Sequence, residues 1–444
     1  MRSWLVVVIA LAGCDRVLGL ERPCDEARFG STCSTCGGVG QACCASATTC
    51  GDGLFCGDGT CNECVLDVAP GRRHMCSLRY DGTVWCSGQN ENAQRGSMVS
   101  EDRVTVPEQL LAADGEPFGD VVSIAAGRNH TCAVRRDGTV WCWGRNSQGQ
   151  LGNGLTALDR SPTPTQVIRA NGTPITSIVA VRAGYCHTCA LDSGKGVLCW
   201  GCGSIGELGD GTQQGRALAA PVLDATLTQP ITDVVEITVG HNHSCVRTTS
   251  GVVHCWGDNQ HGQIGDGRRG TVAVVLAPYK VLENVSMVAA GSFFTCATKV
   301  DGTAWCWGRA DGDRIGDGND DLPEDKDIPT SVTQSFLGPP FLGATEVSVG
   351  TAACLRGEGA RVWCWGKDQY GTTGGGGSTV PAPVVTSDGT QLADVDRLVG
   401  HYAHTCAHQT SGRFVCWGRN TSGQLANGTF AHTGTPATLQ LTCP

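Results

Sequence analysis

Short apolar segments alternate with glycine-rich polar stretches along most of the chain. Segments 121–127, 234–240 and 285–291 are rich in β-branched residues and end in Ala-Gly or Val-Gly, which predicts a buried strand. Two more short apolar segments follow, separated by a pair such as Asp137-Gly138. Asp-Gly between two apolar runs is a hairpin signal, so each buried strand is expected to lead into a β-hairpin.

A fourth element completes the pattern. The glycine-rich loop 146–154 follows the hairpin and returns at 206–211 and 262–267, with a partial copy at 423–425. A proline-led strand is predicted after it, for example from Pro221, because proline is tolerated at the start or edge of a strand. Each unit therefore contains four predicted strands.

Two cysteines mark every unit, and the second always follows the first by ten positions. The pairs are Cys76/Cys86, Cys132/Cys142, Cys189/Cys199, Cys245/Cys255, Cys296/Cys306, Cys354/Cys364 and Cys406/Cys416. Successive first cysteines are 51 to 58 residues apart, a period typical of propellers and repeat arrays. Seven units of four strands predict an all-β fold, a seven-bladed β-propeller over residues 65–444.

The constant spacing favours disulfides within the hairpins. If the hairpin loop has three residues, with Gly138 in a left-handed conformation, Cys132 lies opposite Cys142 with Cα atoms about 4.5 Å apart, within disulfide range. A metal held by His130, Cys132 and Cys142 is the alternative, but it would need ligands that the repeat does not supply. A further disulfide is expected between Cys186 and Cys202, which flank the third hairpin.

The units resemble the repeat of the regulator of chromosome condensation family. They share Gly-x-x-His-Thr, an Asp-Gly turn, Trp-Gly-x-Asn, Gly-Gln-Leu-Gly and a later Pro-x-x-Val over roughly residues 65–442. The paired cysteines are an addition to the family pattern, and Ser87, Phe294 and Ala352 depart from it. The resemblance implies a seven-bladed propeller. Among similar proteins are the nucleotide exchange factor for the GTPase Ran and secreted bacterial propellers that inhibit enzymes.

Residues 1–13 have the features of an export signal. A basic start precedes an apolar core too short to span a bilayer as a helix, and Leu11-Ala12-Gly13-Cys14 resembles the bacterial lipobox. We expect Cys14 to be acylated, to become the first mature residue and to anchor the chain to the cell envelope, with 14–23 as a linker. An ordinary secretory peptide with a chance cysteine is the alternative.

A small cysteine-rich module is predicted over residues 24–64. It contains Cys24, Cys33, Cys36, Cys43, Cys44, Cys50, Cys56, Cys61 and Cys64. A segment of this size cannot bury enough apolar surface to fold unaided, so disulfides are expected to hold it, with a four-thiolate zinc site as the alternative. Nine cysteines are an odd number, so one of them, with Cys64 favoured, is expected to pair with Cys443. A free or intermolecular cysteine is the other possibility.

Composition supports the exported assignment. The chain has 27 cysteines, too many for a reducing cytosol unless they bind metal. Its net charge of −10 argues against a surface that binds nucleic acid.

Two residue types follow the repeat and could carry chemistry. One repeat position is occupied by His74, His130, His187, His243 and His404. A structural hydrogen bond to an adjacent loop is favoured over a metal-binding ring, because Phe294 and Ala352 interrupt the series.

Ten tryptophans flank the second cysteines, and packing between blades is favoured over a carbohydrate-stacking surface. They are Trp85, Trp141, Trp143, Trp200, Trp256, Trp305, Trp307, Trp363, Trp365 and Trp417.

One loop is crowded with acidic residues. It contains Asp311, Asp313, Asp317, Asn319, Asp320, Asp321, Glu324, Asp325 and Asp327. A solvated acidic loop is favoured over calcium binding, because the EF-hand spacing is absent.

No catalytic motif is recognisable in the sequence. We therefore expect no catalytic residue and no cofactor. The predicted function is that of an envelope-anchored, non-catalytic scaffold whose inter-repeat loops bind a protein or glycan partner. An exchange factor-like regulator and an extracellular enzyme inhibitor are the alternatives.

Overall fold

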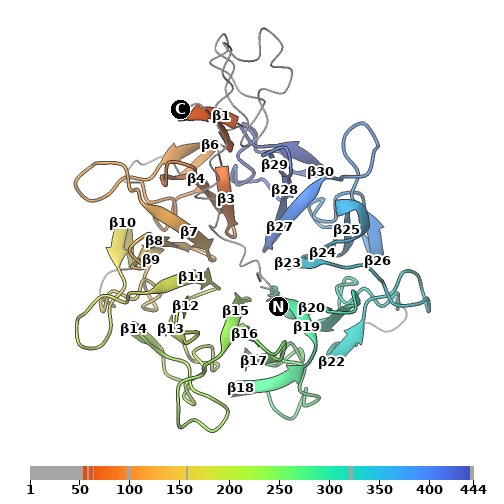
Figure 1. The fold of residues 1–444 in the computed structure, drawn as a ribbon, viewed down its shortest axis with the longest axis horizontal. Coiled ribbons are helices and arrows are strands. Elements are labelled where there is room, and N and C mark those ends of the chain that lie inside the picture. Colours follow the sequence, from red (N-terminus) through yellow and green to blue (C-terminus); the bar gives the residue numbers. More distant parts are fainter. Residues whose placement is uncertain are drawn as a thin grey trace, which may run out of the picture.

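The computed structural model describes residues 54–57, 60–63, 65–97, 102–156, 159–319 and 324–440. Strands β3 to β30 form seven four-stranded antiparallel sheets arranged as blades around a central axis (Figure 1). A separate two-stranded sheet precedes them, β1 (Leu54–Gly57) with β2 (Thr60–Glu63). The predicted seven-bladed all-β propeller is therefore confirmed.

Each blade is one uninterrupted stretch of chain, with its strands paired in sequence order. Blade 1 is β3 (Val65–Pro70), β4 (His74–Arg79), β5 (Val84–Gln89) and β6 (Arg103–Gln109); blade 2 is β7 (Val121–Ala126), β8 (His130–Arg135), β9 (Val140–Arg145) and β10 (Arg160–Gln166); blade 3 is β11 (Ile178–Ala183), β12 (His187–Asp192), β13 (Val197–Gly201) and β14 (Arg216–Pro221); blade 4 is β15 (Val234–Val239), β16 (His243–Thr248), β17 (Val253–Asp258) and β18 (Val274–Leu282). Blade 5 is β19 (Val285–Ala290), β20 (Phe294–Lys299), β21 (Ala304–Gly308) and β22 (Lys326–Ser331); blade 6 is β23 (Glu346–Val349), β24 (Ala352–Arg356), the short 3₁₀ helix η1 (Glu358–Ala360), β25 (Val362–Gly366) and β26 (Ser378–Pro383); blade 7 is β27 (Val395–His401), β28 (His404–Gln409), β29 (Phe414–Gly418) and β30 (Thr433–Thr438).

The hairpin between the second and third strands has the predicted three-residue loop. In blade 2, Gly138 has φ 77°, and its amide donates to the Arg135 carbonyl at 2.8 Å. The Asp137 carboxylate accepts from the Thr139 amide at 2.9 Å, which fixes the turn. This geometry places Cys132 directly opposite Cys142.

The proline-led fourth strand was predicted wrongly at its boundary. In blade 3 the strand β14 begins at Arg216 and ends at Pro221. Pro221 lies on the outer edge strand, where a missing amide hydrogen breaks no ladder bond, so proline is tolerated at this end as well. The pairing of β13 with β14 also shifts register between Cys199 and Gly201, so the sequence pattern does not reveal where β14 begins.

The core lies between neighbouring blades. One buried cluster joins Leu78 and Val84 of blade 1 to Ile124, Ala133 and Trp143 of blade 2. Because each sheet buries its faces against the next blade, a single blade has no complete core of its own. Among the described residues, the structure contains no helix long and apolar enough to cross a membrane.

Candidate functional site

The repeated cysteines are paired across their hairpins. The disulfides are Cys76–Cys86, Cys132–Cys142, Cys189–Cys199, Cys245–Cys255, Cys296–Cys306, Cys354–Cys364 and Cys406–Cys416, with Cα atoms 4.0 to 4.1 Å apart. Cys186 and Cys202 form an eighth disulfide at 5.5 Å. Glu207 lies close to that pair, but sulfurs bonded to each other offer no thiolate to a metal.

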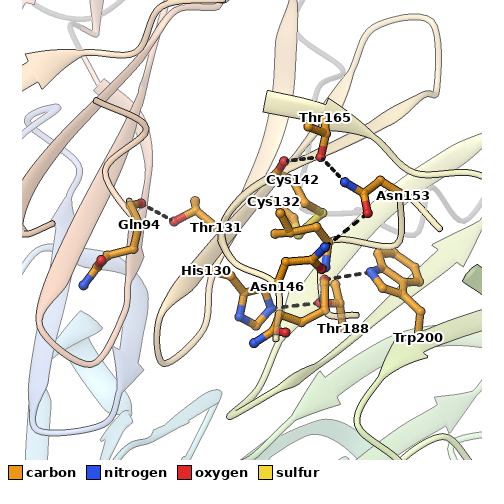
Figure 2. Close-up of a disulfide and its surroundings, with 12 residues drawn as sticks. Gln94, His130, Thr131, Cys132, Cys142, Asn146, Asn153, Thr165, Thr188 and Trp200 are labelled. Atoms are coloured by element: carbon orange, nitrogen blue, oxygen red, sulfur yellow. Dashed lines mark hydrogen bonds between the residues drawn. A yellow bond between two sulfur atoms is a disulfide. The ribbon is translucent and has the colours of Figure 1, made fainter. Parts of the chain in front are cut away.

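The repeated histidine binds the neighbouring blade. His130 Nε2 lies 2.8 Å from Thr188 Oγ1, and the Thr188 hydroxyl donates to the Gln150 carbonyl at 3.1 Å (Figure 2). Trp200 Nε1 donates to the same carbonyl at 2.9 Å. Because Thr188 gives its hydrogen to Gln150, His130 must donate from Nε2. The Gly-Gln-Leu-Gly loop of blade 2 is thereby fixed to blade 3.

The same contact recurs at other boundaries between blades. His74, His187 and His243 lie 2.8 to 3.0 Å from Thr131, Ser244 and Thr295, respectively. The first residue of the motif must be glycine, because a Cβ at Gly127 would lie 2.6 Å from His130 Cε1. Burial lowers the pKa of all five repeated histidines to about 3, so they are neutral. These contacts support the structural role over the metal-binding ring.

The histidine contact is missing where blade 7 meets blade 1. Met75 stands at the position of Thr131, and neither ring nitrogen of His404 has a partner among the described residues. Ser87 also replaces the tryptophan of the repeat. The boundary is closed instead by an ion pair between Arg397 and Asp67 at 3.3 Å and by apolar packing around Met75.

Six of the ten tryptophans are fully buried between blades: Trp143, Trp200, Trp256, Trp307, Trp365 and Trp417. The other four are half-buried near the hairpin turns. Arg79 lies 3.7 Å from the Trp85 ring, and Lys299 lies 4.9 Å from the Trp305 ring. Inter-blade packing thus accounts for the buried six.

The loops divide between two opposite faces of the propeller. The loop after each first strand and the loop after each third strand lie at one end of a blade, as the hydrogen bond from the Arg145 amide to the Asn129 carbonyl shows (2.8 Å). The hairpin turns lie at the other end, where the Val121 amide donates to the Gly82 carbonyl at 3.1 Å. The first of these faces is called the arginine face below, and the second the hairpin face.

Five arginines gather on the arginine face. They are Arg72 and Arg73 of blade 1, Arg128 and Arg145 of blade 2 and Arg419 of blade 7. The pKa of Arg128 is lowered first by burial and then by the positive charges of Arg72, Arg145 and Arg73. Burial and the charges of Arg73 and Arg72 likewise lower the pKa of Arg419. The five guanidinium groups therefore form one electrostatic cluster.

Two of these arginines donate to neutral hydroxyl groups. Arg145 donates to Ser147 Oγ at 2.8 Å, and Arg419 donates to Thr421 Oγ1 at 3.2 Å. Arg309 differs, because it forms an ion pair with Asp311 at 2.6 Å. In the part of the chain that the structure describes, none of the five has a carboxylate partner. A positive patch without counter-charge stands out on a chain of net charge −10.

Aromatic side chains line the centre of the same face. The Arg128 guanidinium lies 4.0 Å from the centre of the Tyr185 ring, and Tyr185 packs on His241 at 4.3 Å. Phe293 follows at 5.0 Å from His241, and Tyr402 of blade 7 reaches to 6.2 Å from the same ring. Arg72, Arg128, Tyr185, His241, Phe293 and Tyr402 are together called the central basin.

The basin is rigid because its loops are bonded to each other around the axis. The Arg72 amide donates to the Gly127 carbonyl at 3.3 Å, and the Arg128 amide donates to the Gly184 carbonyl at 3.0 Å. The His241 amide donates to the Gly291 carbonyl at 3.1 Å. The inner strands that carry these loops surround the axis in Figure 1. Fixed loops hold the basin side chains in place without a ligand.

Carboxylates of the acidic loop pair with basic side chains of the same protein. Asp325 accepts from His261 at 2.8 Å and pairs with Arg269 at 3.4 Å, and Asp317 pairs with Lys326 at 3.4 Å. Asp320 and Asp321 lie outside the described residues. The described carboxylates of this loop form no convergent oxygen cluster, so they give the calcium alternative no support.

Several predictions fall outside the described residues. They include the export signal, Cys14 with its linker, most of the cysteine-rich module, Cys64 and Cys443. Within the module, Cys56 lies opposite Cys61 in the β1–β2 hairpin. The pairing of Cys443 and the lipid anchor stay predictions.

Sequence reasoning missed the arginine face. Its residues occupy the variable positions between the glycine and the histidine of each repeat and the position after Trp-Gly. Aligning the seven units and comparing only these positions would have placed Arg72, Arg128 and Arg145 in adjacent units. The loops after the third strand, beginning beyond Gly144, were expected to bind a partner, and their first residues do lie on this face.

The chain is a seven-bladed β-propeller with a cluster of arginines on one of its two faces. The RCC1-like domain model matches residues 29–384. The chain therefore belongs to the RCC1-like domain family, which confirms the resemblance found in the repeats.

The chain is also similar to individual members. It is 30% identical to the ultraviolet-B receptor UVR8 of Arabidopsis thaliana over 344 residues, covering 74% of this chain and 70% of the receptor. It is 26% identical to the human E3 ubiquitin-protein ligase HERC2 over 78% of this chain but only 7% of the ligase. The crystal structure of Prp20p from Saccharomyces cerevisiae, described with its binding properties to Gsp1p and histones, superposes with a TM-score of 0.65, 20% identity and coverage of 82% and 87%. That structure shows the fold alone.

Proposed function

We propose that this propeller is a non-catalytic interaction scaffold that is anchored to the cell envelope and binds a protein partner through its arginine face. The observation that carries the proposal is the cluster of five arginines without a carboxylate partner among the described residues. A positive patch on an acidic chain attracts a negatively charged surface and orients it during encounter. Family members whose names or descriptions mention protein partners add support.

Rigid loops suit this role. The bonded ring of central loops leaves little backbone freedom to lose on binding. The aromatic rings of the central basin add area of the kind that is enriched at binding hot spots.

The binding half of the proposal is tested by affinity capture. The mature protein, an Arg72→Ala/Arg128→Ala variant and an Arg136→Ala control are used to capture proteins from a detergent extract of the envelope. Arg136 is an exposed arginine of the hairpin face. We expect the wild type and the control to retain the same partner and the double variant to lose it. Equal retention by all three would contradict the proposal.

The anchoring half is tested separately. A Cys14→Ala variant is expressed beside the wild type, and membranes are separated from soluble material. We expect the wild type in the membrane fraction and the variant in the soluble fraction, because acylation is what holds the chain. An unchanged distribution would rule out the lipid anchor and leave the binding face untouched.

The exchange factor-like alternative has one supporting observation, the family itself. Capture of a small GTPase by the arginine face, with faster nucleotide release, would favour it over the scaffold.

A further inference from the structure

We propose that the central basin is a binding site for the carboxylate groups of an acidic peptide segment, an inference that rests on the proposed function because it assigns the chemistry of the partner at the same face. The walls of the basin come from blades 1 to 5, and Tyr402 of blade 7 reaches towards His241. One acidic side chain entering near the axis would meet groups from several blades at once.

The basin contains hydrogen-bond donors that have no acceptor. Tyr402 is 8% exposed, and its hydroxyl has no partner among the described residues. Arg128 Nε is also buried and unpartnered, as is Arg73 Nε of the arginine cluster outside the basin. Buried polar groups are normally paired, because leaving one unpaired is costly. His241 Nδ1 is buried and unpartnered as well, and in a neutral ring it can donate or accept, whereas the guanidinium only donates. A carboxylate, which only accepts, suits the guanidinium and phenol donors of the basin.

Tyr402 and His241 are held in the neutral state. Burial raises the pKa of Tyr402 above its usual value, so the phenol keeps its hydrogen and can donate it. Burial, followed by the charges of Arg128 and His401, lowers the pKa of His241 to about 4. The positive charge of the basin therefore comes from its arginines, and Tyr402 adds a neutral donor beside them.

The arginine geometry favours carboxylate. The Arg128 guanidinium lies over the Tyr185 ring, 4.0 Å from its centre, and its Nε has no hydrogen-bond partner among the described residues. Arg72 contributes a second guanidinium close enough to affect the pKa of Arg128. Planar guanidinium edges bind carboxylates with two parallel hydrogen bonds.

The distribution of charge favours a short acidic segment over a long polyanion. The five arginines of the cluster lie in blades 7, 1 and 2, whereas on blade 5 Arg309 of the same face is paired with Asp311, and Asp258 and Asp325 add negative charge on blades 4 and 5. A nucleic acid crossing this face would meet both signs of charge. A segment with a few acidic side chains fits the positive part alone.

The test uses the mature protein and a fluorescently labelled hexaglutamate peptide, with a hexaglutamine peptide as the uncharged control. Binding is followed by fluorescence anisotropy. We expect hexaglutamate to bind and hexaglutamine not to bind. The Arg72→Ala/Arg128→Ala variant should lose about tenfold or more in affinity, because a hydrogen bond to a charged group contributes more than a neutral one. Tyr402→Phe, which removes only the hydroxyl, should lose about threefold or more, and Arg136→Ala should bind like the wild type.

Three results would overturn the inference. The first is the absence of hexaglutamate binding, and the second is equal binding by the wild type, the double variant and Tyr402→Phe. The third is displacement of hexaglutamate by inorganic phosphate at equal concentration, which would assign the basin to phosphate. Any of these results with continued arginine-dependent capture of an envelope protein would leave the proposed function standing. Loss of that capture would remove the proposed function.

Discussion

The repeated histidine contributes to the fold as a neutral donor. In blade 2 the ring of His130 donates to Thr188, which donates to the carbonyl of Gln150. A protonated ring would place a charge in a fully buried position, and for this reason its pKa falls to about 3. The residue that looked most like a metal ligand in the sequence therefore links two blades.

This state makes stability depend on pH. An unfolded histidine titrates near its ordinary pKa of 6.5, whereas folded His243 titrates at about 3. The unfolded state binds the proton first, so stability is full above the unfolded pKa and is lost as the pH falls towards the folded value. Each such histidine should lower the free energy of unfolding by roughly 1.4 kcal/mol per pH unit in that window.

The prediction is tested with His243→Phe, because Phe294 is fully buried at the equivalent position of blade 5. Urea unfolding of the wild type and the variant is compared at about pH 6 and about pH 5, where histidine linkage applies. We expect the free energy to fall less steeply for the variant, by the contribution of one histidine. Burial raises the pKa of some carboxyl groups, such as that of Glu207. These groups increase the free energy of unfolding as the pH falls, but they do so equally in the wild type and the variant. Identical slopes would show that His243 does not remain neutral in the folded protein.

At the scale of the element, the hairpin is the best-determined part of each repeat. The turn after β8 fixes the register of β8 and β9, and this register brings Cys132 opposite Cys142 at a Cα distance of 4.1 Å. Closing a short loop by a disulfide stabilises the folded chain by about 2–3 kcal/mol in the chain-entropy account. The adjacent blade also depends on this turn, because the Gly138 carbonyl accepts from the Ile178 amide at 3.1 Å.

Replacing Gly138 by alanine should therefore lower the free energy of unfolding by more than the same replacement at a left-handed glycine without close neighbours. Its φ is +77°, and a Cβ would lie 2.7 Å from the Ser177 amide nitrogen. Gly115 is the matched control, with φ +87° and no atom within 4 Å of its Cβ position. We expect Gly115→Ala to lose about 1 kcal/mol in denaturant unfolding and Gly138→Ala to lose clearly more. Equal losses would mean that the contact between blades is not tight at this point.

The hairpins could be predicted because their signals are local. The Asp-Gly pair, the spacing of ten and the β-branched strands each act within a dozen residues. The start of β14 could not be predicted, since a register shift and the edge position of Pro221 determine it. The partner of His130 is equally invisible in sequence, because Thr188 lies 58 residues away and meets it only when two blades pack.

At the scale of the whole molecule, closing the ring creates features that no single repeat contains. Tyr402 lies beside His241 only because seven blades bring blade 7 round to face blade 4. The arginine cluster likewise joins Arg419 of blade 7 to Arg73 of blade 1. The sequence predicted the number of blades, but the central basin depends on the closed ring.

Ring closure also explains the departures in the first repeat. Met75 and Ser87 replace the threonine and the tryptophan of the pattern, and Met75 packs against apolar residues of blade 7 across the boundary of the ring. His404 accordingly lacks the partner that His130 finds in Thr188. Terminal repeats of an array commonly depart from the pattern in this way.

The central claim is that one face of this propeller binds the partner. Arg145 and Arg136 are exposed arginines of the same blade on opposite faces. A photo-crosslinking amino acid is introduced at each position in turn, and crosslinks formed in the intact envelope are compared. We predict a discrete crosslinked partner from position 145 and none from position 136. Crosslinks from position 136 alone, or the same product from both positions, would contradict the account.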